Sequence, residues 1–159
     1  MKLKIPNFSK RETHCYPKEN DGLLLAYENA VSKFPKQRQK AIRDMVAKEL
    51  VLEYPIHANK VIWTGKGDVL FFDSWSKKRF YSDHDIVEGT LNRLDHYIKR
   101  SKEPVSMSEI YSGWSVPSIG RGKNEIGFTE GIDYEIKIVE EGDYVNNVIL
   151  FVTRPHNII

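Results

Sequence analysis

Two apolar, β-forming segments near the end of the sequence constrain the fold of this chain more than any other feature. Residues 133–139 (DYEIKIV) and 144–152 (YVNNVILFV) lie on either side of the polar turn Glu140–Asp143. In the first segment the even-numbered residues share one side of a strand and the odd-numbered residues share the other. This alternation around a glycine-bearing turn predicts an antiparallel β-hairpin.

Two helices are predicted in the N-terminal part. Asn20 or Asp21 can cap a first helix that runs through Val31. The second predicted helix, Pro35–Glu53, begins at a proline, which a first helical turn tolerates because its N–H has no helical partner anyway. Both segments carry an apolar stripe at helical spacing. We expect them to form an αα-hairpin.

A third, longer helix and a short fourth one are predicted between residues 82 and 114. Ser82 and Asp85 have the spacing of a capping box, and the helix they open extends to Arg100. Ser106 or Ser108 can then cap a short helix that passes through Ile110 and Tyr111.

The clearest strand signal of the first half lies between these pairs of helices. Val61–Trp63 and Val69–Phe72 are β-forming and are joined by the glycine-bearing segment Thr64–Asp68. We expect these two segments to pair as a small β-hairpin. Residues 74–81 (SWSKKRFY) are interpreted as a basic, aromatic connector.

Together these elements predict an α+β fold. Its parts are an N-terminal helical hairpin, a small β-hairpin, a long third helix, a helix-turn segment and a C-terminal antiparallel β-hairpin. The length of 159 residues suits a single compact domain, with possible sub-regions at 1–81 and 82–159. Forty per cent hydrophobic residues suffice for a packed interior.

Composition also limits the location and the cofactors. The sequence has no apolar run near the ~18 residues of a membrane span and no signal peptide at its start, so we expect no membrane. Cys15 is the single cysteine and cannot form an internal disulfide, which favours a reducing, cytoplasmic compartment. The five histidines lack zinc spacing, and no metal or other cofactor is predicted.

Charge is unevenly distributed along the chain. Residues 1–60 hold twelve Lys and Arg against seven Asp and Glu, whereas residues 132–159 hold two against five. A polyanion would be attracted to the N-terminal part and repelled by the C-terminal hairpin.

The order of elements in the C-terminal half resembles a winged helix-turn-helix. LNRLDHYIKR (91–100) is similar to a supporting helix, PVSMSEIYSGW (104–114) to the first helix of the turn, and SVPSIGRGKNEIGF (115–128) to a recognition helix. The hairpin at 133–153 is similar to the wing. In this family the second helix of the turn enters the major groove of DNA.

The resemblance implies a small, non-catalytic, nucleic-acid-binding or regulatory protein. The residues that it would bring to DNA are Ser115, Ser118, Arg121, Lys123 and Asn124. Arg121 suits a guanine or a phosphate, and Asn124 suits an adenine. An alternative stays open, because Gly120 and Gly122 would weaken a recognition helix by ~1 kcal/mol each. Residues 112–131 would then form a surface loop.

A second resemblance concerns GFTEGIDYEI (127–136), which is similar to segments of phage antirepressor proteins. It implies a viral, phage-type regulatory or accessory protein.

Two further basic clusters are candidate contacts for nucleic acid. The second predicted helix presents Lys36, Lys40 and Arg43, which an acidic partner or a solvated surface would equally suit. In the connector, Lys77, Lys78 and Arg79 stand among aromatic residues, a combination that suits bases and phosphates.

Two other classes of function remain. A structural or assembly protein, or an inhibitor, would act through protein contacts, with the acidic hairpin as an edge that pairs with a partner; such a chain could form a homo-oligomer. A metal-dependent nuclease is the third hypothesis. It would have to draw on Glu53, Asp68, Asp73 and Lys77, yet the two aspartates are expected on opposite sides of one strand.

Overall fold

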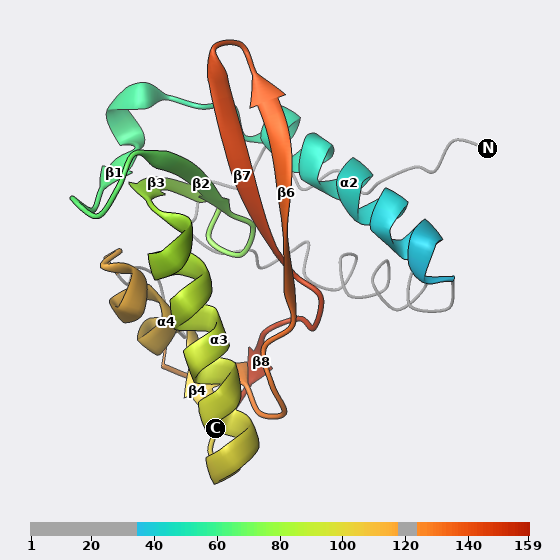
Figure 1. The fold of residues 1–159 in the computed structure, drawn as a ribbon, viewed down its shortest axis with the longest axis vertical. Coiled ribbons are helices and arrows are strands. Elements are labelled where there is room, and N and C mark those ends of the chain that lie inside the picture. The colour runs from blue at the N-terminus through green and yellow to red at the C-terminus, as the bar shows by residue number, and fades with distance from the viewer. Residues whose placement is uncertain (1–34, 118–123) are drawn as a thin grey trace.

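The computed structural model describes residues 35–117 and 124–159. In these residues the chain forms three α-helices, one 3-10 turn and eight strands (Figure 1). The helices are α2 (Lys36–Glu53), α3 (His84–Ser101) and α4 (Met107–Trp114), and the 3-10 turn is η1 (Ala58–Lys60). The strands are β1 (Ile62–Trp63), β2 (Val69–Asp73), β3 (Lys78–Ser82), β4 (Val105–Ser106), β5 (Ile126–Phe128), β6 (Tyr134–Glu141), β7 (Tyr144–Phe151) and β8 (His156–Asn157). The α+β class is thereby confirmed.

A mixed five-stranded sheet forms the centre of the molecule. Its strand order is β1-β3-β2-β7-β6. The hairpins β2–β3 and β6–β7 are antiparallel, whereas β1 with β3 and β2 with β7 are parallel pairs. Because β2 and β7 are central neighbours, the predicted sub-regions 1–81 and 82–159 share one sheet. Strands β4, β5 and β8 form a small second sheet.

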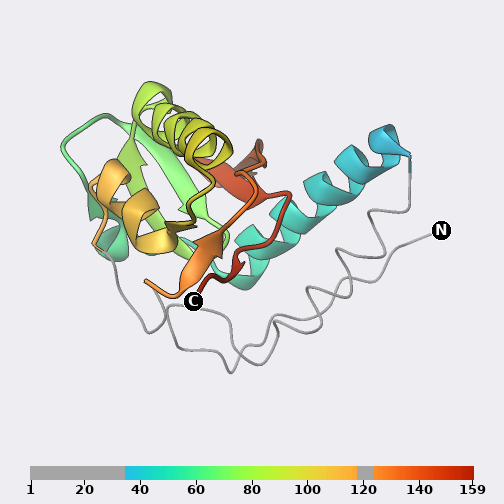
Figure 2. The same cartoon turned by 90° about the horizontal axis from the view of Figure 1, so that it is seen from below.

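Helices cover both faces of the central sheet (Figure 2). Helix α2 packs on β6 and β7, and α3 and α4 pack against each other on the opposite face. Successive residues of the central strands alternate between these two sides. Phe71 and Ile149 join the core under α3 and α4, whereas Phe72 and Val148 join the core under α2.

Most of the helix predictions in the described residues are confirmed. Helix α2 matches the predicted range to within one residue, and Ser106 forms a capping box with Glu109 at the start of α4. The cap of α3 was predicted one residue early: the Asp83 carboxylate, and not the Ser82 hydroxyl, accepts the hydrogen bond from the Ile86 N–H. The predicted first helix at 21–31 lies outside the described residues, and the αα-hairpin stays a prediction.

The predicted small β-hairpin joined the wrong pair of segments. Val69–Phe72 does form a hairpin strand, but it pairs with Lys78–Ser82, which was interpreted as a connector. The Val61–Trp63 segment instead lies parallel to β3 at the edge of the sheet. The physical reason is the turn at Asp73, whose carboxylate binds the Trp75 and Ser76 N–H groups and reverses the chain directly.

The C-terminal hairpin is confirmed, with Tyr134–Glu141 paired to Tyr144–Phe151 across a two-residue turn. Through β7 it is continuous with β2, so it is part of the central sheet. Within 35–117 and 124–159, no helix has the length and apolar character required to cross a bilayer.

Candidate nucleic-acid interface

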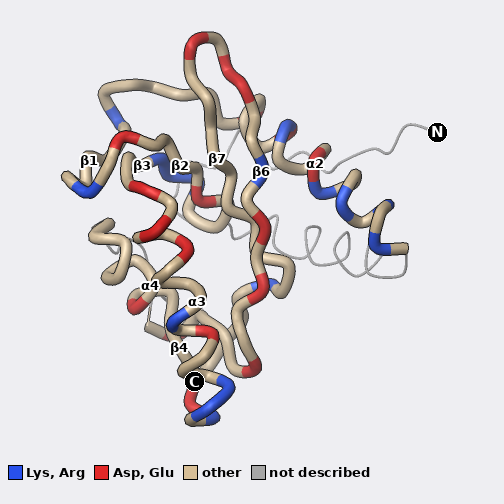
Figure 3. Tube along the Cα trace, in the orientation of Figure 1, with Lys and Arg blue, Asp and Glu red and all other residues tan. Residues whose placement is uncertain are grey.

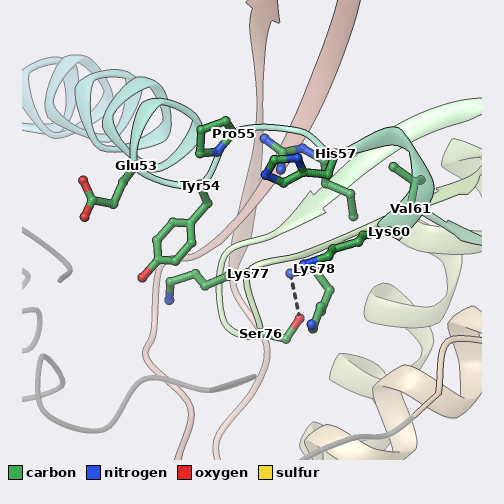
Figure 4. Close-up of a pocket in the computed structure, with 10 residues that line it drawn as sticks. Glu53, Tyr54, Pro55, His57, Lys60, Val61, Ser76, Lys77 and Lys78 are labelled. Atoms are coloured by element: carbon green, nitrogen blue, oxygen red, sulfur yellow. Dashed lines mark hydrogen bonds between the residues drawn. The ribbon is translucent and has the colours of Figure 1, made fainter. Parts of the chain in front are cut away.

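A small basic pocket lies where the end of α2 meets the β2–β3 hairpin (Figure 4). Its volume is about 260 Å³. The lining residues are Glu53, Tyr54, Pro55, His57, Lys60, Val61, Ser76, Lys77, Lys78 and Arg79. Figure 4 shows the Glu53 carboxylate pointing away from the lysines. The pocket therefore gathers cations from two segments that are about twenty residues apart in the sequence.

The β2–β3 turn fixes the position of two of these cations. The fully buried Asp73 carboxylate accepts hydrogen bonds from the Ser76 hydroxyl at 2.8 Å and the Tyr111 hydroxyl at 2.7 Å. Lys77 adopts a left-handed backbone with φ of 62° and donates its Nζ to the Ser74 carbonyl at 2.7 Å. Its Nζ also lies 5.9 Å from the centroid of the Tyr54 ring.

Arg79 lines the pocket and has its charge balanced by Glu141 inside the protein. Its Nε donates to Asn146 Oδ1 at 2.7 Å, and its Nη2 lies 3.1 Å from Glu141 Oε1. The guanidinium also stacks 4.5 Å above the Phe72 ring. Burial lowers the pKa of Arg79, and the charge and hydrogen bond of Glu141 oppose that shift. Arg79 is thus a structural group, which leaves the lysines to attract a ligand.

Two of these lysines have no internal charge partner. Within the described residues, neither the Lys60 nor the Lys78 ammonium takes part in an ion pair or hydrogen bond. Lys66, exposed in the turn that precedes β2, is equally unpaired in that part of the chain. Figure 3 shows Lys and Arg positions around β1 and β3, whereas Asp and Glu follow the β6–β7 hairpin and the start of α3.

An aromatic pair, formed by the exposed Trp63 and the half-buried Tyr81, lies beside the pocket. Trp63 of β1 is 69 % exposed, and its ring stacks on that of Tyr81 with centroids 4.1 Å apart and an interplanar angle of 20°. Tyr81 and Arg79 are two residues apart on β3 and therefore share one face of the sheet. We call Lys60, Trp63, Lys66, Lys77, Lys78 and Tyr81 the basic–aromatic surface.

The residues predicted from the winged-helix resemblance are only partly described. Ser115 is exposed and ends α4 in a left-handed conformation with φ of 60°, so it does not cap a following helix. Asn124 is exposed in the turn before β5, so the end of the predicted recognition helix is wrong: it is a turn followed by the strand Ile126–Phe128. Ser118, Arg121 and Lys123 lie outside the described residues, and their contact with DNA stays a prediction.

The predicted basic cluster on α2 is divided by its contacts. Lys36 and Lys40 are exposed, whereas the Arg43 guanidinium is ion-paired with the Glu135 carboxylate of β6. Helix α2 also lies on the opposite side of the sheet from α4 (Figure 2). The structure thus separates Lys36 and Lys40 from Ser115.

Sequence reasoning found half of the basic–aromatic surface and missed the rest. Lys77, Lys78 and Tyr81 were recognised in the connector, but Lys60, Trp63 and Lys66 were not. The missing signal was the pairing of β1 with β3, which places Trp63 opposite Tyr81. The position of Trp63 between Lys60 and Lys66 in the sequence was the available local hint.

The residues of the nuclease hypothesis do not converge on a common point. Asp68 is exposed before β2, and the Asp73 carboxylate is enclosed by hydrogen bonds. Among residues 35–117 and 124–159, no group of three or more His, Cys, Asp or Glu is placed to hold a metal ion.

The fold and the pocket define a mixed α+β protein with a cationic, aromatic-flanked surface on one edge of its sheet. Comparison with known proteins adds a family assignment. Residues 27–123 match the model of DUF6353, a family of unknown function, and the chain belongs to this family. The matched range includes every residue of the basic–aromatic surface. No curated protein and no solved structure matches the chain.

Proposed function

We propose that this chain is a non-catalytic nucleic-acid-binding protein that takes single-stranded nucleic acid on its basic–aromatic surface. The observation that carries the proposal is the exposed Trp63 ring, stacked on Tyr81 beside a pocket lined by lysines. Aromatic platforms of this kind stack with unpaired bases, and nearby cations bind the phosphates.

Exposure of the indole favours a single strand over a duplex. Trp63 is 69 % exposed, so its ring is accessible to a base without any rearrangement of the protein. Stacking a base on the ring would bury apolar surface that now faces water. In a duplex the base faces are already stacked, and only their edges and the backbone are accessible. A pocket of about 260 Å³ has room for a phosphate and part of its sugar.

The rest of the molecule would orient the strand. Acidic residues on the β6–β7 hairpin and at the start of α3 repel a polyanion, whereas Lys60, Lys66 and Lys78 attract it. A bound strand would therefore run along β1 and the β2–β3 turn, away from β6.

Binding can be tested with a fluorescein-labelled oligothymidylate of about 12 nucleotides titrated with the full chain. Trp63→Ala should weaken binding by ~1–3 kcal/mol through lost stacking. Lys60→Ala with Lys78→Ala should reduce the slope of log K against log salt by about 1.4, because each phosphate contact on a single strand contributes about 0.7.

Lys36→Ala with Lys40→Ala is the matched control, since it removes the same charge from exposed positions of α2. If the two double variants lost the same affinity, binding would depend on the total charge of the protein and not on the proposed surface. No binding at about 50 mM salt would contradict the proposed function itself.

Binding of duplex DNA through a winged-helix arrangement is a second candidate function. It is supported by the packing of α3 on α4, where the Trp114 indole N–H donates to the Val87 carbonyl at 3.1 Å and Gly113 lies against Thr90. In this mode Arg121→Ala with Lys123→Ala would abolish duplex binding and leave oligothymidylate binding intact.

A further inference from the structure

A second surface of the molecule, at the outer edge of the sheet formed by β6, has the properties of a peptide-binding edge. We infer that the free edge of β6 binds an extended segment of a partner protein as an additional strand of the sheet. The segment would carry apolar side chains at alternate positions and a Lys or Arg between them. This inference goes beyond the proposed function and does not depend on it.

The backbone of β6 is the first part of the argument. β6 is an outer strand of the central sheet, paired only with β7 among the described strands. Glu141 and Tyr144 close a two-residue turn, and such closing residues bond to each other, so every second residue of β6 bonds inward. The N–H and C=O groups of Ile136, Ile138 and Glu140 therefore point outward. An unpaired row of this kind is a template for another strand.

An apolar groove runs along this same edge. Its volume is about 760 Å³, and it lies between the last turns of α2 and the distal half of the hairpin. Its lining includes Val51, Leu52, Pro55, Ile138, Val139 and Glu140. Leu52 is 74 % exposed and Ile138 is 68 % exposed, so two large apolar side chains face solvent at this groove.

The two sides of the strand set the expected sequence of the partner. Val139 faces α2, so side chains of an added strand on that side would meet Leu52, Val51 and Pro55 and should be apolar. Side chains on the other side would lie beside Ile138 and Glu140. The Glu140 carboxylate has no ion pair or hydrogen bond with any described residue, which favours a Lys or Arg there.

A charged side chain that would discourage strand pairing is found in the first half of β6, at Lys137. Edge strands are often shielded by an inward-pointing charge, and Lys137 is such a residue. Its ammonium is held at 3.1 Å from Asp44 and 3.7 Å from Glu135. Ile138–Glu141 has no comparable lysine, so the distal half of β6 is the open part of the edge.

A displayed library of random peptides about nine residues long, selected on the full chain, tests the inference. Enriched peptides should alternate apolar residues and carry a Lys or Arg between them. Leu52→Asp and Glu140→Lys should each weaken their binding about tenfold or more. Ile159→Asp and Glu130→Lys, which make the same changes at other exposed positions, should not.

Backbone pairing is tested by N-methylation of an enriched peptide. Methylation of the alternate amides that face β6 should abolish binding. Methylation of the other alternate amides should leave binding unchanged, because only every second amide of an added strand faces β6. Equal effects of the two sets would overturn the strand geometry. Failure to enrich any such peptide, or binding that Leu52→Asp leaves unchanged, would overturn the site.

Two controls separate the other outcomes. Trp63→Ala should leave peptide binding unchanged, so that failure of either proposal is seen independently of the other. Light scattering of the full chain alone should show no dimer that depends on this edge, that is, no dimer that is present in the wild type and lost in Leu52→Asp. Such a dimer would make a second copy the occupant of the edge and overturn the assignment to a partner protein.

Discussion

The Asp73 carboxylate is fully buried between the β2–β3 turn and helix α4. Burial raises its pKa above the ordinary value of 3.8, and the hydrogen bonds from Tyr111, Ser76 and the backbone oppose that rise without cancelling it. The protonated form is therefore favoured more in the folded protein than in the unfolded chain. Because the same carboxylate shapes the turn that presents Lys77 and Lys78, its charge state and the geometry of the site are linked.

The sign of this shift gives a pH prediction. A carboxyl whose folded pKa is raised contributes most to stability below its unfolded pKa, and loses that contribution as pH rises through the folded pKa. Asp73→Asn removes the titration. The difference in free energy of unfolding, wild type minus variant, should therefore fall as pH rises from about 3.8, as measured by urea unfolding at several pH values. A difference that grows with pH would contradict the buried, raised carboxyl.

A second prediction concerns the charged network under the pocket. Arg79→Ala leaves Glu141 and Asn146 without their partner in a half-buried site, and should lower the free energy of unfolding by ~3–5 kcal/mol. Lys78→Ala, at the adjacent cation whose ammonium pairs with no described residue, should change it by no more than ~0.5 kcal/mol. Urea unfolding of the two variants provides the comparison. Similar losses in both would show that Arg79 is not a structural group.

At the level of elements, periodicity was sufficient to find the three described helices, β1, β2 and the β6–β7 hairpin. It missed the strands β3, β4, β5 and β8, and it did not pair β1 and β2 correctly. The β-forming residues of Val61–Trp63 and Val69–Phe72 predicted two strands correctly, and the glycines between them favoured a hairpin. The parallel pairing of β1 with β3 depends on contacts outside that segment, where Ile62 lies opposite Phe80. Such long-range pairing has no local signature.

The candidate site, too, was predictable only where its residues are close together in the sequence. Lys77, Lys78 and Tyr81 are adjacent in sequence, and their alternation of cations and aromatic rings was visible there. Lys60 and Trp63 join them only because β1 lies on β3. Alternation predicted the C-terminal hairpin, and its edge was a hypothesis for partner binding. That β6 is the outer strand depends on the pairing of β7 with β2, and the groove depends on Leu52 of α2, whose packing on the hairpin no local pattern specifies.

Two glycines test how closely the small sheet and helix α3 are packed. A Cβ on Gly127 would lie 1.9 Å from the Val105 carbonyl oxygen, so Gly127→Ala must push β4 from β5 and should cost ~1–3 kcal/mol of stability. A Cβ on Gly89 of α3 meets no atom within 4 Å. Gly89→Ala should add ~0.5–1 kcal/mol through helix propensity. Thermal unfolding of both variants checks the two signs, and a neutral Gly127→Ala would contradict the close approach of β4 and β5.

For the molecule as a whole, the central sheet joins two hydrophobic cores, one on each of its faces. Neighbouring residues of β2, Phe71 and Phe72, face opposite cores, as do Val148 and Ile149 of β7. A strand cannot leave one core without withdrawing side chains from the other. The two cores are thus expected to unfold in one cooperative transition, although helix α2 and helix α4 lie on opposite faces of the sheet.

Leu50→Ala in the core under α2 tests this coupling. Leu50 is only 3 % exposed, so the truncation should lower the free energy of unfolding by ~2–5 kcal/mol. If the sheet couples the cores, native-state hydrogen exchange should show the most protected amides of α3, on the far face, losing the same free energy as those of α2. Ile110→Ala in α4 is the reciprocal variant and should lower protection in α2. Loss confined to α2 in the first variant would mean that the helix detaches alone, and the apolar groove beside Leu52 would then open and close with it.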